Sequence, residues 1–186
     1  MRTLRLSLAG TVILALLGGL SGVVIAQDEE ALASDRPHPV SGTLQYAGTF
    51  APGTVVLEDG QGLQRGYGSR DYIEMDDARL SGYLWHVWNR DYIDVEPHLG
   101  VEGEVLTGTV ELVNDDGSWV GTMRGYFSMD PRTHYWHIAL TGTDAHEGLS
   151  TLLYAAGPAG GLIDVEGFVF PGVLPEYPAP VEVPGQ

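Results

Sequence analysis

The chain has 186 residues, with 25 acidic residues against nine basic ones, all of them arginine, and it has no cysteine. Charged residues make up only 18% of the chain, where about 25% is ordinary. The net charge of −16 therefore results from a shortage of basic residues and not from a surplus of acidic ones. Without lysine, the scattered arginines cannot line a phosphate-binding groove, which disfavours nucleic acid and anionic membrane surfaces as partners. The lack of cysteine excludes disulfides, thiol chemistry and thiolate metal sites.

The first 26 residues are typical of an export signal peptide. Arg2 and Arg5 precede a run without charge from Leu6 to Ala26, which is also long enough to be an uncleaved membrane anchor. Glycines interrupt this run half-way and small residues end it, so we expect cleavage before Gln27 and a secreted, extracytoplasmic product. Loss of the two arginines would change the formal charge from −16 to −18, which favours a soluble protein.

Composition divides the remaining chain into three parts. An acidic linker is expected at 27–39, a domain dense in apolar residues and glycine at 40–172, and a proline-rich tail at 173–186. The middle part, of about 130 residues, is large enough to bury roughly two thirds of its unfolded surface. We therefore expect one domain that folds by burial alone, with no metal and no cofactor.

Short runs of β-branched and aromatic residues between glycine and Asn/Asp turns predict an all-β domain. Strands are expected at 43–47, 54–58, 80–88, 105–113, 118–128, 134–141, 149–155 and 162–170. The clearest hairpin turns at 114–117, where Asp116-Gly117 favours a tight turn that ends in a left-handed glycine. Glycines inside strands favour a single antiparallel barrel of about eight strands over the alternative, a β-sandwich.

One five-residue pattern occurs twice. Arg70 to Glu74 recurs as Arg90 to Asp94, but the flanking residues do not repeat. A solenoid needs at least three copies to bury a continuous core. We interpret the pair as coincidence or as two similar loops around the strand at 80–88.

The histidines do not predict a metal site. His134 and His137 lie three apart on one expected strand and so point to opposite faces, whereas zinc needs three or four convergent ligands. His134 shares the core-like face with Trp136. For His86 we favour a buried or half-buried, hydrogen-bonded histidine inside the barrel over a general base. No catalytic residue is predicted.

The acidic residues form loose clusters, and none matches a calcium-binding loop or fixes a pair of glycosidase carboxylates. We interpret all four clusters as solvated surface: Glu74, Asp76 and Asp77; Glu102 and Glu104; Asp115 and Asp116; Asp164 and Glu166.

The strand at 80–88 carries apolar or aromatic residues on both faces, although a barrel strand should alternate. Its alternation predicts His86 and Trp88 inside, and Tyr83 and Trp85 outside. A second subunit, a loop such as 67–73, or a small apolar ligand would cover the outer face. The candidate binding residues are therefore Trp85, Tyr83, His86, Trp88 and, on another strand, His137.

Three stretches carry a resemblance to known proteins: Asp77-Ala78-Arg79-Leu80-Ser81-Gly82, Asn114 to Gly121 (NDDGSWVG), and Gly142 to Leu149 (GTDAHEGL). In this order they resemble a group of exported bacterial β-barrel proteins of unknown function, with a pattern similar to allene oxide cyclase and dirigent-like barrels. The resemblance spans roughly 40–172 and implies a barrel. The position of Asp144 is commonly glycine in that pattern and that of His146 commonly aromatic, so both depart from it. No catalytic residue carries over.

Two functions from different classes fit these observations. We favour a non-enzymatic exported barrel that binds a small apolar ligand or a protein partner, which includes a homo-oligomer contact. The alternative is an allene oxide cyclase-like isomerase or cyclase that holds an apolar substrate in the lumen and uses His86 or His137. A lumen that holds a histidine and a carboxylate together would favour the alternative, and a lumen filled by side chains would exclude it.

Overall fold

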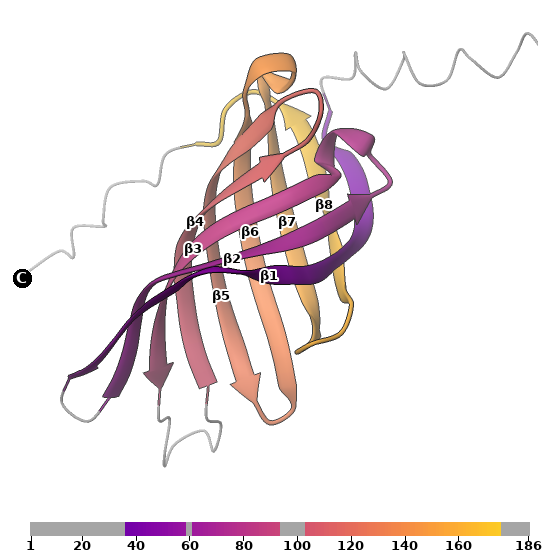
Figure 1. Cartoon of the computed structure of the whole chain (residues 1–186). Helices are drawn as coiled ribbons and strands as arrows, with labels where there is room; N and C mark the ends of the chain where they lie inside the picture. The colour runs from indigo at the N-terminus through magenta and orange to yellow at the C-terminus, as the bar shows by residue number, and fades with distance from the viewer. Residues whose placement is uncertain (1–35, 59–60, 94–102, 176–186) are drawn as a thin grey trace, which may run out of the picture. The chain divides into compact units, whose positions relative to one another are not determined.

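The structure is a computed structural model that describes residues 36–58, 61–93 and 103–175. Eight antiparallel strands follow one another around a single closed ring, in which β8 pairs with β1 (Figure 1). In chain order they are β1 (His38–Glu58), β2 (Gln61–Met75), β3 (Gly82–Ile93), β4 (Gly103–Val113), β5 (Ser118–Met129), β6 (Arg132–Gly142), β7 (Leu149–Pro158) and β8 (Ile163–Pro171), with two 3₁₀ turns, η2 (Ala78–Leu80) and η3 (Asp144–His146). The prediction of an all-β, eight-stranded antiparallel fold is confirmed.

The predicted export signal, most of the acidic linker and most of the proline-rich tail lie outside the described residues. Where the chain is described, no helix has the length and hydrophobicity of a membrane span. β1 begins at His38, two residues before the predicted start of the domain, and the Val40 side chain is already part of the core.

The first two strands differ from the prediction. The stretches expected at 43–47 and 54–58 form one strand, β1, which bends at register shifts between Tyr46 and Gly48 and between Thr49 and Ala51. Residues 67–73, expected as a loop, belong to β2. Both copies of the repeated pattern, as far as they are described, lie in strands (β2 and β3), so the prediction of two similar loops is wrong. Glycines at 62, 66 and 68 conceal the alternation of β2 in the sequence.

The predicted hairpin at 114–117 joins β4 to β5 as expected. The side chain of Asn114 fixes this turn, because its Oδ1 accepts hydrogen bonds from the backbone N–H of Asp116 and of Gly117, both at 3.1 Å. Gly117 does not have a positive φ, so the prediction of a left-handed glycine is wrong. The Asn114 side chain satisfies the turn's N–H groups instead.

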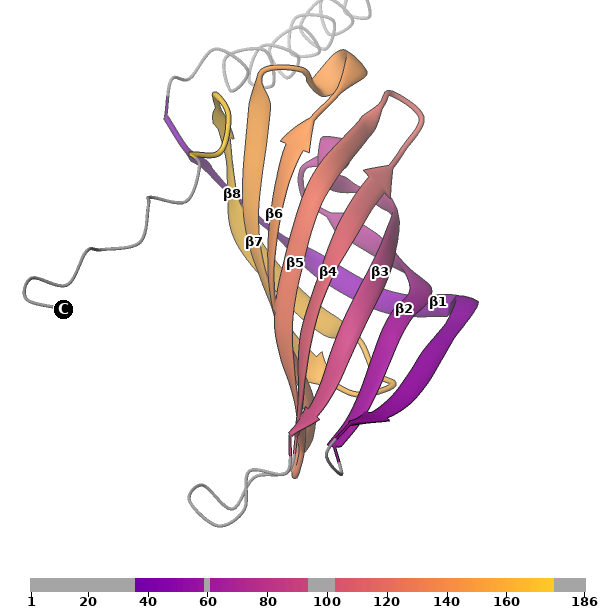
Figure 2. The same cartoon turned by 90° about the vertical axis from the view of Figure 1, so that its left-hand side faces the viewer.

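Inward side chains alternate with outward ones, and they fill one end of the ring completely. The largest of them is Trp119 of β5, which is fully buried, as are Leu44, Ile73, Leu84, Leu112 and Leu140. This filled end carries the β4–β5 turn, η2 and η3 (Figures 1 and 2). Burial of aliphatic and aromatic surface here supplies the main stabilisation of the fold.

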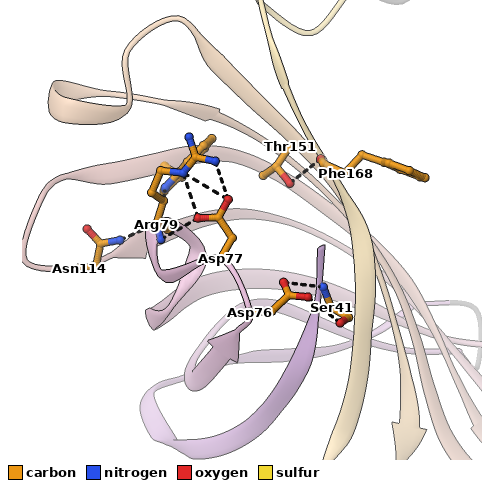
Figure 3. Close-up of polar contacts among 8 residues, drawn as sticks. Ser41, Asp76, Asp77, Arg79, Asn114, Thr151 and Phe168 are labelled. Atoms are coloured by element: carbon orange, nitrogen blue, oxygen red, sulfur yellow. Dashed lines mark hydrogen bonds and ion pairs between the residues drawn. The ribbon is translucent and has the colours of Figure 1, made fainter. Parts of the chain in front are cut away.

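Polar contacts close the filled end around η2 (Figure 3). Burial alone would raise the pKa of Asp77, but hydrogen bonds from Arg79 outweigh it and hold that pKa below its usual value. The backbone carbonyl of Arg79 accepts hydrogen bonds from Asn114 Nδ2 and Trp119 Nε1, each at 2.8 Å. The His146 ring stacks on Trp119 at 5.1 Å. The three stretches that carry the family resemblance therefore meet here, in a structural role.

Two positions that depart from the resembling pattern have a local explanation. Asp144 has a φ of 55°, the left-handed conformation that favours glycine, and it is the one non-glycine residue with a positive φ in the described part of the chain. The buried His146 stacks on an indole, as an aromatic residue would. The resemblance itself stays a prediction.

Candidate functional site

The other half of the lumen contains a cavity of about 250 Å³. Aromatic rings and a few aliphatic side chains wall it, together with a group of polar residues from β2 and β3. The lining residues are Tyr46, Tyr67, Ser69, Asp71, His86, Trp88, Arg90, Leu106, His134, Trp136, Gly160, Gly161 and Ile163. At about 30 Å³ per water molecule, the cavity has room for roughly eight waters or one small organic molecule.

The cavity reaches the point where the pairing of β1 with β8 stops, since Ile163, the first residue of β8, lines it. The two strands are paired only from His38 with Val169 to Leu44 with Ile163, and beyond Leu44 β1 continues with β2 alone. Figure 2 shows the hairpin of β1 and β2 leaving the ring at this end. The phenol groups of Tyr46 and Tyr67 lie beside the opening and are joined through Thr49 Oγ1, at 2.6 and 2.7 Å.

A hydrogen-bonded chain of three buried residues forms one wall of the cavity. His86 Nε2 lies 2.8 Å from Asp71 Oδ2, and His86 Nδ1 lies 3.3 Å from Ser69 Oγ. All three residues are at most 3% exposed. They come together because Ser69 faces His86 directly across β2 and β3, while Asp71 is the next inward residue of β2. In the tautomer that carries its proton on Nε2, His86 donates to the Asp71 carboxylate and Nδ1 accepts a hydrogen bond from Ser69 Oγ.

A salt bridge that is mostly buried lies in the same half of the lumen. Arg90 of β3 forms a salt bridge with Glu104 of β4, and its guanidinium lies over the Tyr67 ring at 5.3 Å. Glu104 is only 3% exposed. The interpretation of Glu104 as solvated surface is therefore wrong: its parity on β4 points it inward, where Arg90 neutralises it. Asp77 is also partly buried, and Glu102 lies outside the described residues. The other members of the four clusters are exposed, as expected: Glu74, Asp76, Asp115, Asp116, Asp164 and Glu166.

Two buried polar atoms on β6 have no hydrogen-bond partner among the described residues: His134 Nδ1 and Trp136 Nε1. Burial, helped by the nearby Arg90 charge, lowers the pKa of His134 to about 4, so the ring is neutral at pH 7. The Trp136 indole lies against Gly125, where a Cβ atom would come within 2.3 Å of the ring. Such unsatisfied buried groups cost about 1 to 3 kcal/mol each and are few in native proteins.

The structure divides the five predicted binding residues among three places. His86 and Trp88 point into the lumen, as their alternation predicted, and are 3% and 2% exposed. Tyr83 and Trp85 lie on the outer face, also as predicted. The cover on Trp85 comes from the chain itself, because the Phe50 ring and the Arg70 guanidinium each lie 5.4 Å from its ring.

His137 is far from this chemistry, because it points outward from β6. It is exposed and lines a hollow of about 710 Å³ on the outer wall, with Leu152, Tyr154 and Phe168. The hypothesis that His137 supplies a polar group to the lumen is therefore wrong. The outer hollow is larger than the lumen cavity, but only the lumen cavity gathers buried ionisable groups, so we take it as the functional site.

Sequence reasoning found His86 but missed its partners. Asp71, Ser69 and Arg90 occur at alternate positions of strands, in phase with inward apolar residues, and this parity was the available signal. The glycines of β2 conceal this parity for Asp71 and Ser69, whose segment resembles a loop in sequence. Within the described residues, no three His, Asp or Glu side chains gather as a metal site.

Comparison of the chain with protein-family models, curated proteins and solved structures finds no match.

Proposed function

We propose that the protein is an exported β-barrel that binds a small, mostly apolar ligand in its lumen. The observation that carries this proposal is the cavity of about 250 Å³, which combines an aromatic wall with a buried row of polar groups. A cavity of this kind, apolar with a few convergent polar groups, is what small-molecule sites have in common.

The buried charges support a functional role for the cavity. A buried ion pair adds little or nothing to the stability of a fold, compared with apolar residues of similar volume, because the cost of desolvating the charges offsets their Coulomb attraction. Here such a pair, Arg90 with Glu104, and the hydrogen-bonded pair of His86 with Asp71 lie in the same half of one lumen. The filled half of the ring shows that this chain can pack its interior with apolar residues.

The binding proposal predicts that the protein takes up indole, an uncharged molecule small enough for the cavity. We expect a dissociation constant below about 1 mM by isothermal titration calorimetry, a binding free energy of about −4 kcal/mol. Leu106→Trp should abolish binding by filling the cavity. Thr107→Trp, at the next residue of β4 on the exposed face, is the control and should bind as the wild type does. Binding to neither wild type nor control would contradict the proposal.

The pair of His86 and Asp71 also supports a second candidate, a barrel isomerase. A carboxylate that fixes an imidazole at 2.8 Å is a common arrangement for a general base, and here it faces a cavity walled by apolar side chains. In this candidate, His86 Nδ1 exchanges its contact with Ser69 Oγ for a proton from the carbon next to the carbonyl of an apolar substrate, and the enolate that keeps the electron pair later takes a proton back from the imidazolium.

This candidate is tested by the exchange of the α-protons of cyclohexanone in D₂O, followed by NMR. Catalysis by His86 should accelerate exchange by about a hundredfold or more over buffer, and His86→Phe should remove the acceleration. His137→Phe, which alters an exposed histidine on the outer face, should not. If indole binds but the exchange is not accelerated, the isomerase candidate is rejected and the non-enzymatic binding proposal remains.

A further inference from the structure

One edge of β1 has no strand partner in the described part of the chain. β8 pairs with β1 only as far as Leu44, while β2 follows β1 on the other side to Glu58. From Gln45 onward, every second residue of β1 therefore turns its backbone N–H and C=O to an open edge. Figures 1 and 2 show β1 as the outer strand of the hairpin that leaves the ring.

The last part of this edge lacks the features by which proteins block edge-to-edge pairing. Two register shifts and Pro52 protect the part of β1 before Gly53. Beyond it, Val55, Val56 and Leu57 are 63%, 44% and 79% exposed, so both faces of the strand are open as well as its edge. Short, exposed, β-branched strands of this kind readily pair with another strand.

The distribution of charge favours a second copy of the chain as the partner. No charged residue occurs from Val40 to Leu57, although the chain has 25 acidic residues and a net charge of −16. Two copies of this chain repel each other strongly over most of their surface. The uncharged edge of β1 is a place where a second copy can approach without placing like charges opposite each other.

We propose that the open edge of β1 pairs antiparallel with the same edge of a second copy, which forms a two-fold symmetric dimer. Side chains of directly opposed residues must share a face, so pairing centred on Val56 sets Val56 against Val56 and Val55 against Leu57 of the second copy. Backbone hydrogen bonds and the exposed valine and leucine side chains stabilise the contact. This inference is independent of the ligand proposed for the lumen.

Sedimentation velocity of the mature chain over a range of concentrations tests the dimer. We expect a monomer–dimer equilibrium at micromolar concentrations, strengthened by salt because salt screens the negative charge. Val56→Glu sets two carboxylates directly opposite each other and should raise the dissociation constant at least about tenfold. Val120→Glu is the matched control, since Val120 on β5 is also 44% exposed, and it should dimerise as the wild type does.

Tryptophan fluorescence should show that both variants are folded, because neither side chain is in the core. Leu57→Glu, at the most exposed of the three positions, provides a second test should Val56→Glu fail to fold. A wild-type chain that stays monomeric up to about 1 mM would overturn the proposal. Equal loss of dimer in Val56→Glu and Val120→Glu would overturn it too, because the contact would then not be at β1.

Discussion

Replacing Asp71 by alanine should destabilise the protein by about 1 to 3 kcal/mol, although the residue belongs to no aliphatic cluster. The change leaves His86 buried, at 3% exposure, without the carboxylate that accepts its Nε2–H at 2.8 Å. An imidazole in this position loses a hydrogen bond whether it is charged or neutral. Denaturant unfolding of wild type and variant at pH 7 measures the loss.

The double variant Asp71→Leu with His86→Phe should behave differently. It removes both polar partners together, and the adjoining cavity of about 250 Å³ can accept the added volume. We expect its stability to equal that of the wild type or to exceed it by about 1 to 4 kcal/mol, as for other buried pairs replaced by apolar residues. A double variant as unstable as Asp71→Ala would show that the pair is needed for folding, and would remove the argument that it is retained for function.

The sequence predicted the second half of the ring much better than the first. From β4 to β8, strands and turns follow a clear alternation of apolar and polar residues, and the turn at Asn114 is local chemistry. β1 and β2 contain bulges and glycines, which disrupt the alternation, and their pairing depends on contacts with distant strands. Propensity and periodicity describe neighbours along the chain, so they could not find a strand whose residues are mainly glycine, charged and aromatic.

The candidate site was predicted in part. The inward direction of His86 and Trp88 follows from period-two alternation alone. The partners of His86 could not follow from it, because Asp71 was not recognised as a strand residue and the register of β2 against β3 is set by the whole ring. The cavity reaches the point at which β1 leaves β8, after Leu44, and no local pattern encodes that point.

Low pH should destabilise the protein through the protonation of His134, because burial lowers the pKa of this residue in the folded state. Burial lowers the pKa of His134 to about 4 in the folded state, against 6.5 for an exposed histidine. Between these values the unfolded chain binds a proton that the folded protein does not, so stability is complete above pH 6.5 and falls as the pH drops toward 4. At 1.36 kcal/mol per pH unit, the loss between pH 7.5 and 4.5 should be about 2 to 3 kcal/mol.

The variant His134→Phe isolates this effect, because it keeps an aromatic ring beside Phe127, 4.6 Å away, and removes the titrating group. Its free energy of unfolding, measured with denaturant at pH 7.5 and 4.5, should fall by about 2 kcal/mol less than that of the wild type. His137→Phe, on the exposed face of the same strand, should retain the wild-type pH dependence.

The pKa of His146 is also lowered by burial, so a smaller slope of the same sign should remain in His134→Phe. Asp76 and Asp77 have pKa values lowered from 3.8, so they contribute mainly below this window. An unchanged slope in His134→Phe would mean that His134 protonates as readily in the folded protein as in the unfolded chain, which would contradict the effect of burial on its pKa.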